Sequence, residues 1–268
     1  MAEIRHDCIE VRWHMRGVKN ILPLVFLLLV CIHGYAYPAK GKLTRKEQTL
    51  EDKAKKWDID ISQKFKSDAV TGKPVSGIFL VKDLQNFFEC LEYLPENFVK
   101  RSGINKIVIL DDLALKNEPA GGVACGNVMV LRKGFHKHVF YHELFHIFDD
   151  TVHTNKQWCN LNPKDFVYKG SSFYEVELKK RDAKKVEKNS WLNKMMPHFV
   201  SEYAMSFEHE DRAEVFAAMV VEGKDFRKRT AKSAVMRKKM NMIMDMTESK
   251  RLLGRDFWKK RLNGKPLE

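Results

Sequence analysis

The sequence predicts an α+β protein in which a small mixed sheet lies over helices and a mostly helical part follows. Short apolar runs of strand length alternate, up to residue 132, with longer stretches whose apolar residues recur every three or four positions. Helical spacing then dominates from residue 210 onward. With 44% hydrophobic and 31% charged residues, the 268-residue chain has a globular composition and the length for one or two domains.

The first 36 residues have the features of a secretory signal peptide. The twelve-residue apolar run ILPLVFLLLVCI, residues 21–32, is followed by small residues at Gly34 and Ala36, which suits cleavage after Ala36. The run is short for a membrane span, which needs about 20 apolar residues; an uncleaved anchor is the alternative. We therefore expect an exported protein that is periplasmic, extracellular or associated with the cell envelope.

The elements that follow are predicted from apolar spacing. We expect a helix within 42–69, a strand at 77–81, a helix over 84–99, strands at 107–110 and 127–132, and helices over 140–150, 210–222 and within 232–263. The main domain is expected to span 37–222, with a charged insertion at about 155–190. Gly223 stands in a helix-ending position, and a basic helical extension is expected over 223–268.

The net charge of +13 is unevenly distributed. Fifteen basic and five acidic residues lie between Gly223 and Glu268, so most of the net charge falls in this segment. It could bind an anionic polymer or membrane surface of the envelope, or it is a solvated helical face. Nucleic acid is excluded as a partner, because export is expected and no nucleic-acid-binding motif occurs.

The cysteines give no support for a metal site of their own. After removal of the signal peptide, Cys90, Cys125 and Cys159 remain, which permits at most one internal disulfide. None of them has the CxxC spacing of a cysteine zinc site.

The segment FYHELFHIFDD, residues 140–150, carries the chemistry of greatest interest. His142 and His146 are four apart and therefore lie on one face of a helix, so that both imidazoles can bind one Zn²⁺. Glu143 is displaced around the helix and can act as a general base towards a metal-bound water. The alternative to a zinc site is two partly exposed histidines and a glutamate that forms a salt bridge. His138, just before the motif, is expected to be exposed.

The third ligand must come from elsewhere in the chain. The three-histidine pattern HExxHxxGxxH fails, because Asp149 and Val152 stand where glycine and histidine are needed. Glu210 and Glu214, in the helical segment EDRAEVFAA, are again four apart and share a face with small alanines. One carboxylate can bind the metal while the other accepts a hydrogen bond from a ligand histidine. The alternative is a solvated acidic turn at a helix N-terminus.

The motif HELFHIFDD, together with SEYAMSFEHEDRAEVFA at residues 201–217, resembles glutamate-zincin peptidases of the anthrax lethal-factor type and the related secreted proline-specific endopeptidases. This resemblance covers roughly residues 107–221 and implies a zincin-like fold. It implies that Glu210, seven residues after Tyr203, is the third ligand of one zinc ion, with Glu214 behind it. Tyr203 would then donate its hydroxyl to the oxyanion.

The resemblance also implies a peptide-binding strand. Residues 122–128 would form an edge strand along which an extended substrate pairs its backbone, with substrate contacts at Val123, Ala124, Gly126 and Asn127. For the basic segment after Gly223 the resemblance offers no counterpart.

Together these features predict an exported zinc-dependent endopeptidase. His142, His146 and Glu210 hold the zinc ion, water occupies the fourth position, and Glu143 takes the proton of that water. The competing hypothesis is a non-catalytic, zinc-stabilised binding module of the cell envelope that uses its basic C-terminal surface.

Overall fold

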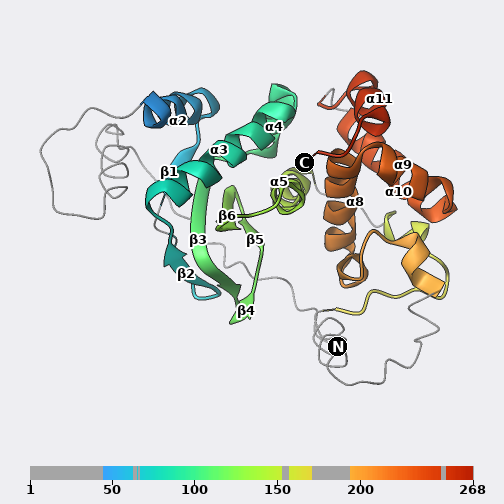
Figure 1. Cartoon of the computed structure of the whole chain (residues 1–268). Helices are drawn as coiled ribbons and strands as arrows, with labels where there is room; N and C mark the ends of the chain where they lie inside the picture. Colours follow the sequence, from blue (N-terminus) through green and yellow to red (C-terminus); the bar gives the residue numbers. More distant parts are fainter. Residues whose placement is uncertain are drawn as a thin grey trace, which may run out of the picture.

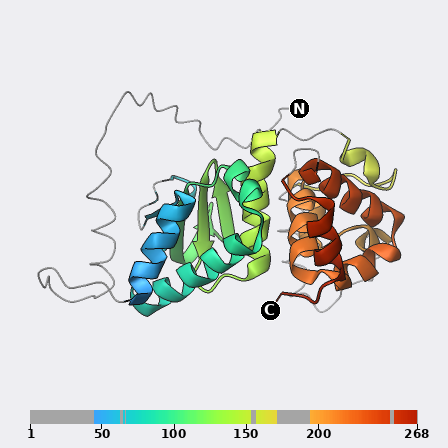
Figure 2. The same cartoon turned by 90° about the horizontal axis from the view of Figure 1, so that it is seen from above.

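A computed structural model describes residues 45–62, 65, 67–152, 157–170, 194–248 and 252–267. The predicted signal peptide, and the predicted insertion except for residues 157–170, lie outside these ranges. The described chain forms a sheet with its covering helices and a second, purely helical part. Figure 1 and Figure 2 show that the two parts meet along α5 (Lys137–Val152) and α8 (Glu208–Glu222).

The sheet is mixed and is built around one long strand, β3 (Lys106–Leu115). This strand pairs in parallel with β1 and β6 and antiparallel with β2 and β4. On the outside, β5 pairs antiparallel with β6, and within the described ranges no strand pairs with its other side. The shorter strands are β1 (Asp60–Ser62), β2 (Val70–Pro74), β4 (Glu118–Pro119), β5 (Gly122–Cys125) and β6 (Val128–Arg132).

Alternating residues of β3 face two apolar layers, as the pleat of a strand requires. Ile107 and Ile109 belong to the main core, which they share with the helices of the sheet half and with α5. Val108 and Leu110 belong to a smaller cluster that includes Val70 of β2. The helices therefore cover one face of the sheet, and α5 lies beside its β5 edge (Figure 2).

The strand expected at residues 77–81 is wrong, because this segment begins helix α3 (Gly77–Tyr93). Leu80 and Leu84 are buried four positions apart, whereas Ile78 and Phe79, just before Leu80, are exposed. The apolar run thus follows the helical period, although its composition is typical of a strand. The helix expected over 84–99 divides at Pro95, which precedes α4 (Glu96–Ser102).

The helix expected within 42–69 is also shorter than predicted. Helix α2 (Arg45–Trp57) ends just before Asp58, which adopts a positive φ of 53°. The chain then enters β1, so Ile61 lies in a strand that pairs with β3 rather than on the face of a helix.

The C-terminal part is helical, as predicted, and packs closely on α8. It comprises α9 (Lys224–Ala231), α10 (Ala234–Glu248) and α11 (Arg255–Asn263). Gly223 ends α8 with a positive φ of 56°, which confirms its predicted helix-ending role. Trp258 of α11 packs edge-on against Phe216 of α8, and Phe216 also stacks on Phe145 of α5. The apolar side chains of the basic C-terminal segment therefore belong to the core beside α8.

The α+β class, the small mixed sheet and the helical C-terminal part are thus confirmed. Among the described helices, none has both the length and the apolar composition that crossing a membrane requires.

Candidate metal centre

Helix α5 carries the HELFH motif and is buried on several sides. Phe140, Leu144 and Ile147 are completely buried in the main core. His142 and His146 point the other way, towards α8, with side chains that are 8% and 16% exposed. The helical period thus places the polar and the apolar residues of the motif on different faces, as the spacing predicted.

Helix α8 brings Glu210 to both histidines. Its Oε2 atom lies 2.9 Å from His142 Nε2 and 3.1 Å from His146 Nε2, and the two Nε2 atoms are 3.0 Å apart. Zinc bonds to nitrogen and oxygen are about 2.0–2.2 Å long, so one ion can contact three atoms that are this close together. Two imidazoles and a carboxylate are also the donor set that zinc accepts, and these three residues therefore fit a zinc ion.

Glu214, one turn further along α8, holds the back of the centre. Its Oε1 atom lies 3.0 Å from His142 Nδ1 and 2.9 Å from His138 Nε2. A hydrogen bond from Nδ1–H to Glu214 leaves the lone pair of His142 on Nε2, the atom that faces Glu210. The structure therefore places Glu210 towards the shared ligand position and Glu214 behind it.

Burial and hydrogen bonding compete in setting the pKa values of this cluster. Burial alone would lower the pKa of His142, but hydrogen bonds with Glu210 and Glu214 outweigh it and raise that pKa well above its usual range. Burial alone would raise the pKa of each carboxyl, but histidine donors hold the pKa values of Glu210 and Glu214 well below their usual range. The cluster thus favours negative carboxylates around a position that suits a cation.

Glu143 lies between α5 and the edge strand β5. Its side chain is buried, and burial raises its pKa. Ala124 of β5 donates its backbone N–H to this carboxylate. A Cβ atom at Gly122 would lie 2.6 Å from Glu143 Cγ, so only glycine lets the strand approach so closely.

Tyr203 lies in the short helix η3 (Tyr203–Met205), which directly precedes α8. Its ring centre is 5.9 Å from that of His142, and its hydroxyl is hydrogen-bonded to Glu210. The structure therefore brings the tyrosine that the resemblance singled out next to two of the three potential ligands, His142 and Glu210.

The predicted substrate-binding residues are only partly brought to the site. Val123 and Ala124 lie in β5, but the edge strand expected at 122–128 ends at Cys125. Gly126, with a positive φ of 55°, and Asn127 form the turn into β6. The carbonyl of Asn127 accepts a hydrogen bond from the backbone of Asn105 and so faces the interior of the sheet, away from the open edge.

Three residues near the centre were not predicted from the sequence. His138 was expected to be exposed, but only 32% of its side chain is exposed, and its ring is bound to Glu214. Its position four residues before His142 on the same helical face was the available clue. His209 contacts the other oxygen of Glu210 at 3.4 Å, and Ser201 donates to Glu214. No spacing rule indicates either of these contacts.

Two buried ion pairs attach α8 to its neighbours. Arg212 binds Asp149 of α5 at 2.7 Å. On the far side, Asp211 binds Lys239 of α10 at 2.6 Å, and both side chains are fully buried. The pair links the residue after Glu210 to the C-terminal helices.

Comparison with known proteins agrees with this centre. Residues 114–263, more than half of the chain, match the family described as "Putative zinc-binding metallo-peptidase". The match runs from β3 to the end of α11 and so includes HELFH, α8 and the basic C-terminal helices. No curated protein matches the chain.

A solved structure is similar as well. It is described as "a putative zinc-binding metallo-peptidase from Bacteroides caccae ATCC 43185", with 15% identity over 83% of this chain and 90% of that chain, at a TM-score of 0.48. The narrower assignment to the lethal-factor type of glutamate-zincins stays a prediction. On the family match, the chain belongs to the "putative zinc-binding metallo-peptidase" family.

Proposed function

We propose that the protein is an exported zinc-dependent endopeptidase whose zinc ligands are His142, His146 and Glu210. The observation that carries this proposal is the convergence of their three ligand atoms, which lie 2.9–3.1 Å from one another. The histidines and the glutamate come from helices far apart in the sequence, and no apolar packing requirement explains why such polar groups should meet in a buried place.

Glu143 is assigned the role of general base. Its raised pKa makes the carboxylate a better proton acceptor than an exposed glutamate. As the water oxygen bonds to the carbonyl carbon, a proton passes to Glu143, and this proton then passes to the amine nitrogen as the C–N bond breaks. A zinc ion held by the three ligands supplies Lewis acidity, which polarises the carbonyl and lowers the pKa of water.

Tyr203 is assigned the role of oxyanion donor. Its hydroxyl lies beside Glu210 and its ring beside His142, so the O–H group is close to the place where the carbonyl oxygen must become negative. A donor aimed at that oxygen stabilises the transition state more than the ground state.

The open edge of β5 is the proposed binding site for an extended peptide. Arg132 donates its N–H to Gly121, so by the alternation of an antiparallel ladder Gly122 and Ala124 turn their backbone groups away from β6. This open edge also runs past Glu143. A peptide that pairs with the backbone groups of Gly122 and the carbonyl of Ala124 would therefore pass the general base, which accepts the Ala124 N–H.

The experiment that tests the function measures zinc content and peptide-library cleavage for the wild type, Glu143→Ala and the exposed control Glu118→Ala. All three proteins should bind one zinc ion. The wild type and Glu118→Ala should cleave, and Glu143→Ala should lose at least about 10²-fold in rate. Zinc binding without cleavage by any of them would instead indicate a non-catalytic, zinc-stabilised binding module.

Export is tested on the mature N-terminus. Sequencing of the protein recovered from its producing cells should begin at Tyr37, after removal of residues 1–36. Recovery of the intact first 36 residues in the membrane fraction would show an anchor instead.

A further inference from the structure

Ser201 joins the metal centre to the segment that carries Tyr203. Its hydroxyl donates to Glu214 Oε2 at 2.6 Å and accepts the backbone N–H of Ala204 at 3.1 Å. The other oxygen of Glu214 holds His142. A single carboxylate therefore orients a potential ligand histidine and, through one serine, also fixes the start of η3.

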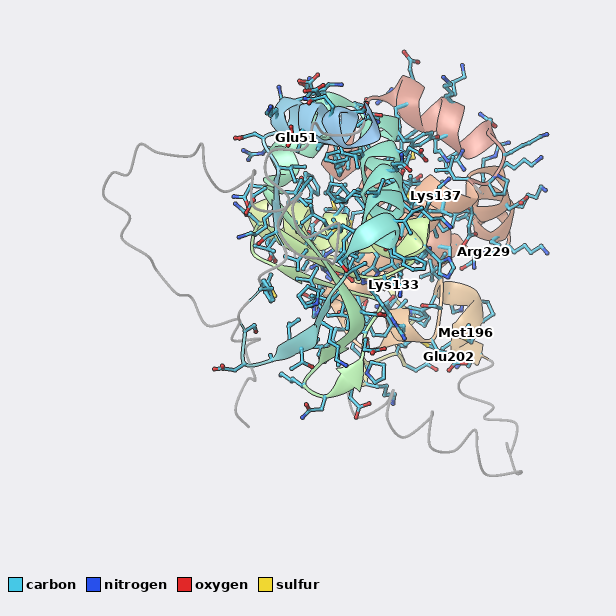
Figure 3. The ribbon with its side chains drawn as sticks, turned by 60° about the vertical axis from the view of Figure 1, so that its left-hand side comes forward. Glu51, Lys133, Lys137, Met196, Glu202 and Arg229 are labelled. Atoms are coloured by element: carbon cyan, nitrogen blue, oxygen red, sulfur yellow. The ribbon has the colours of Figure 1, made fainter. Side chains whose placement is uncertain are left out.

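The turn around Tyr203 is short, and the Ser201 hydroxyl supplies a contact that anchors it. Tyr203 is 38% exposed and begins a helix of three residues. Within the turn, Ser206 donates its N–H to the Tyr203 carbonyl at 3.0 Å. This bond shapes the turn from within, whereas the Ser201 hydroxyl ties its start to α8. Met196 and Glu202, labelled in Figure 3, mark the course of this segment between η2 (Met196–His198) and η3.

We propose that Ser201 is a positioning residue, which bridges Glu214 and the backbone of Ala204 and so holds the Tyr203 hydroxyl where the oxyanion develops. The inference rests on the proposed peptidase function. Loss of one oxyanion donor reduces the rate by about 10²–10³-fold, and a displacement of about 1 Å can reduce it by about 10²-fold. A serine that acts only through Tyr203 can lower the rate by no more than loss of the tyrosine hydroxyl does, and it must have no effect once that hydroxyl is gone.

The test is a double-mutant cycle on the zinc-loaded full chain, with the best peptide from the library as substrate. Tyr203→Phe should lower kcat by about 10²-fold. Ser201→Ala should lower kcat at least about 10-fold, with KM changed by less than about 3-fold. The double variant should match Tyr203→Phe within about 2-fold, because the two residues act as one unit.

Two variants separate positioning from stability. Like Ser201, Ser233 accepts a hydrogen bond from the backbone N–H three residues later, that of Met236 at 3.3 Å. The other partner of the Ser233 hydroxyl is His198, which lies outside the proposed site. Ser233→Ala should therefore lose a similar cap and keep kcat. Ser201→Thr retains a hydroxyl and should restore most of the activity.

Two further readouts do not depend on turnover. Ser201→Ala should bind one zinc ion, as is expected of the wild type. Calorimetry with a phosphinic analogue of the best peptide should show weaker binding to both Ser201→Ala and Tyr203→Phe, each in proportion to its loss of kcat, since the analogue mimics the tetrahedral intermediate.

Several results would overturn the inference while leaving the proposed function intact. The first is an unchanged kcat in Ser201→Ala, and the second is a double variant in which the two losses of kcat multiply. The third is loss of zinc from Ser201→Ala, which would mean that the serine acts on the metal ligands. Absence of cleavage by the wild type would overturn the proposed function itself.

Discussion

The Asp211–Lys239 pair offers the sharpest test of how the C-terminal helices support the metal centre. Lys239 Nζ lies 2.6 Å from Asp211 Oδ2, and both side chains are 0% exposed. Trp158 and Tyr168 donate to the same oxygen at 2.9 and 2.7 Å. The perturbation is Lys239→Met, which keeps the apolar length of the side chain and removes its charge.

The expected loss follows from the burial of the pair. Removing one partner of a fully buried ion pair leaves an uncompensated charge, which destabilises a fold by about 3–5 kcal/mol. Burial raises the pKa of Asp211 despite the opposing charge of Lys239, so proton uptake will relieve part of this loss. We therefore expect about 3 kcal/mol, near the lower limit. For a chain of this size that corresponds to a Tm lower by about 6–12 °C.

The assay is thermal and urea unfolding of the zinc-loaded protein, with Lys228→Met as the matched control. Lys228 pairs with Asp225 at 2.8 Å, but the two side chains are 70% and 48% exposed. An exposed pair contributes about 0–1 kcal/mol, so the control should unfold close to the wild type. Equal unfolding free energies for the two lysine variants would refute the reasoning. The double variant Asp211→Asn/Lys239→Met should recover part of the loss, because no buried charge remains.

The metal centre itself gives three more expectations. Gly122→Ala should keep zinc and lose peptidase activity, because the added Cβ would lie 2.6 Å from Glu143 Cγ. The control Gly121→Ala should stay active, because its Cβ would come no closer than 3.3 Å to a valine methyl. Equal kcat values for the two variants would contradict the steric argument. Calorimetry should show a larger loss of zinc affinity for Glu210→Ala than for Glu214→Ala, whose loss should be about 10–100-fold; the opposite order would exchange their roles. In zinc-free protein, the lowered pKa values of Glu210 and Glu214 contribute stability that is lost as the pH falls below about 4.3. The raised pKa of His142 contributes stability that is lost as the pH rises above about 6.5. Thermal unfolding in a chelator should therefore show greatest stability between these limits, and zinc should move the optimum upward because its ligands bind deprotonated; a zinc-free optimum above pH 8 would argue against this account.

Much of the centre is readable from local spacing. Residues four apart share a helical face wherever the helix lies, so His142 and His146 had to point the same way once α5 formed. The same rule paired Glu210 with Glu214, and the conformational freedom of glycine predicted the end of α8 at Gly223. These relations depend only on helix geometry, and the structure agrees with them.

Apolar composition alone was a poorer guide. Residues 77–81 have the composition of a buried strand, yet they begin α3, because the residues buried against the core recur at the helical period. A short apolar run satisfies both periods, and only the surface available for packing decides between them.

The different positions of Glu210 and Glu214 relative to the histidines belong to the tertiary structure, since spacing left the two equivalent and only the resemblance chose Glu210. The packing of α8 on α5 brings Glu210 Oε2 to both Nε2 atoms and leaves Glu214 facing His142 Nδ1. His146 and Glu210 are 64 positions apart, and no local rule governs a distance of this kind. The angle and register at which two helices pack depend on every side chain between them. The same packing brings Ser201 to Glu214 and Lys239 to Asp211.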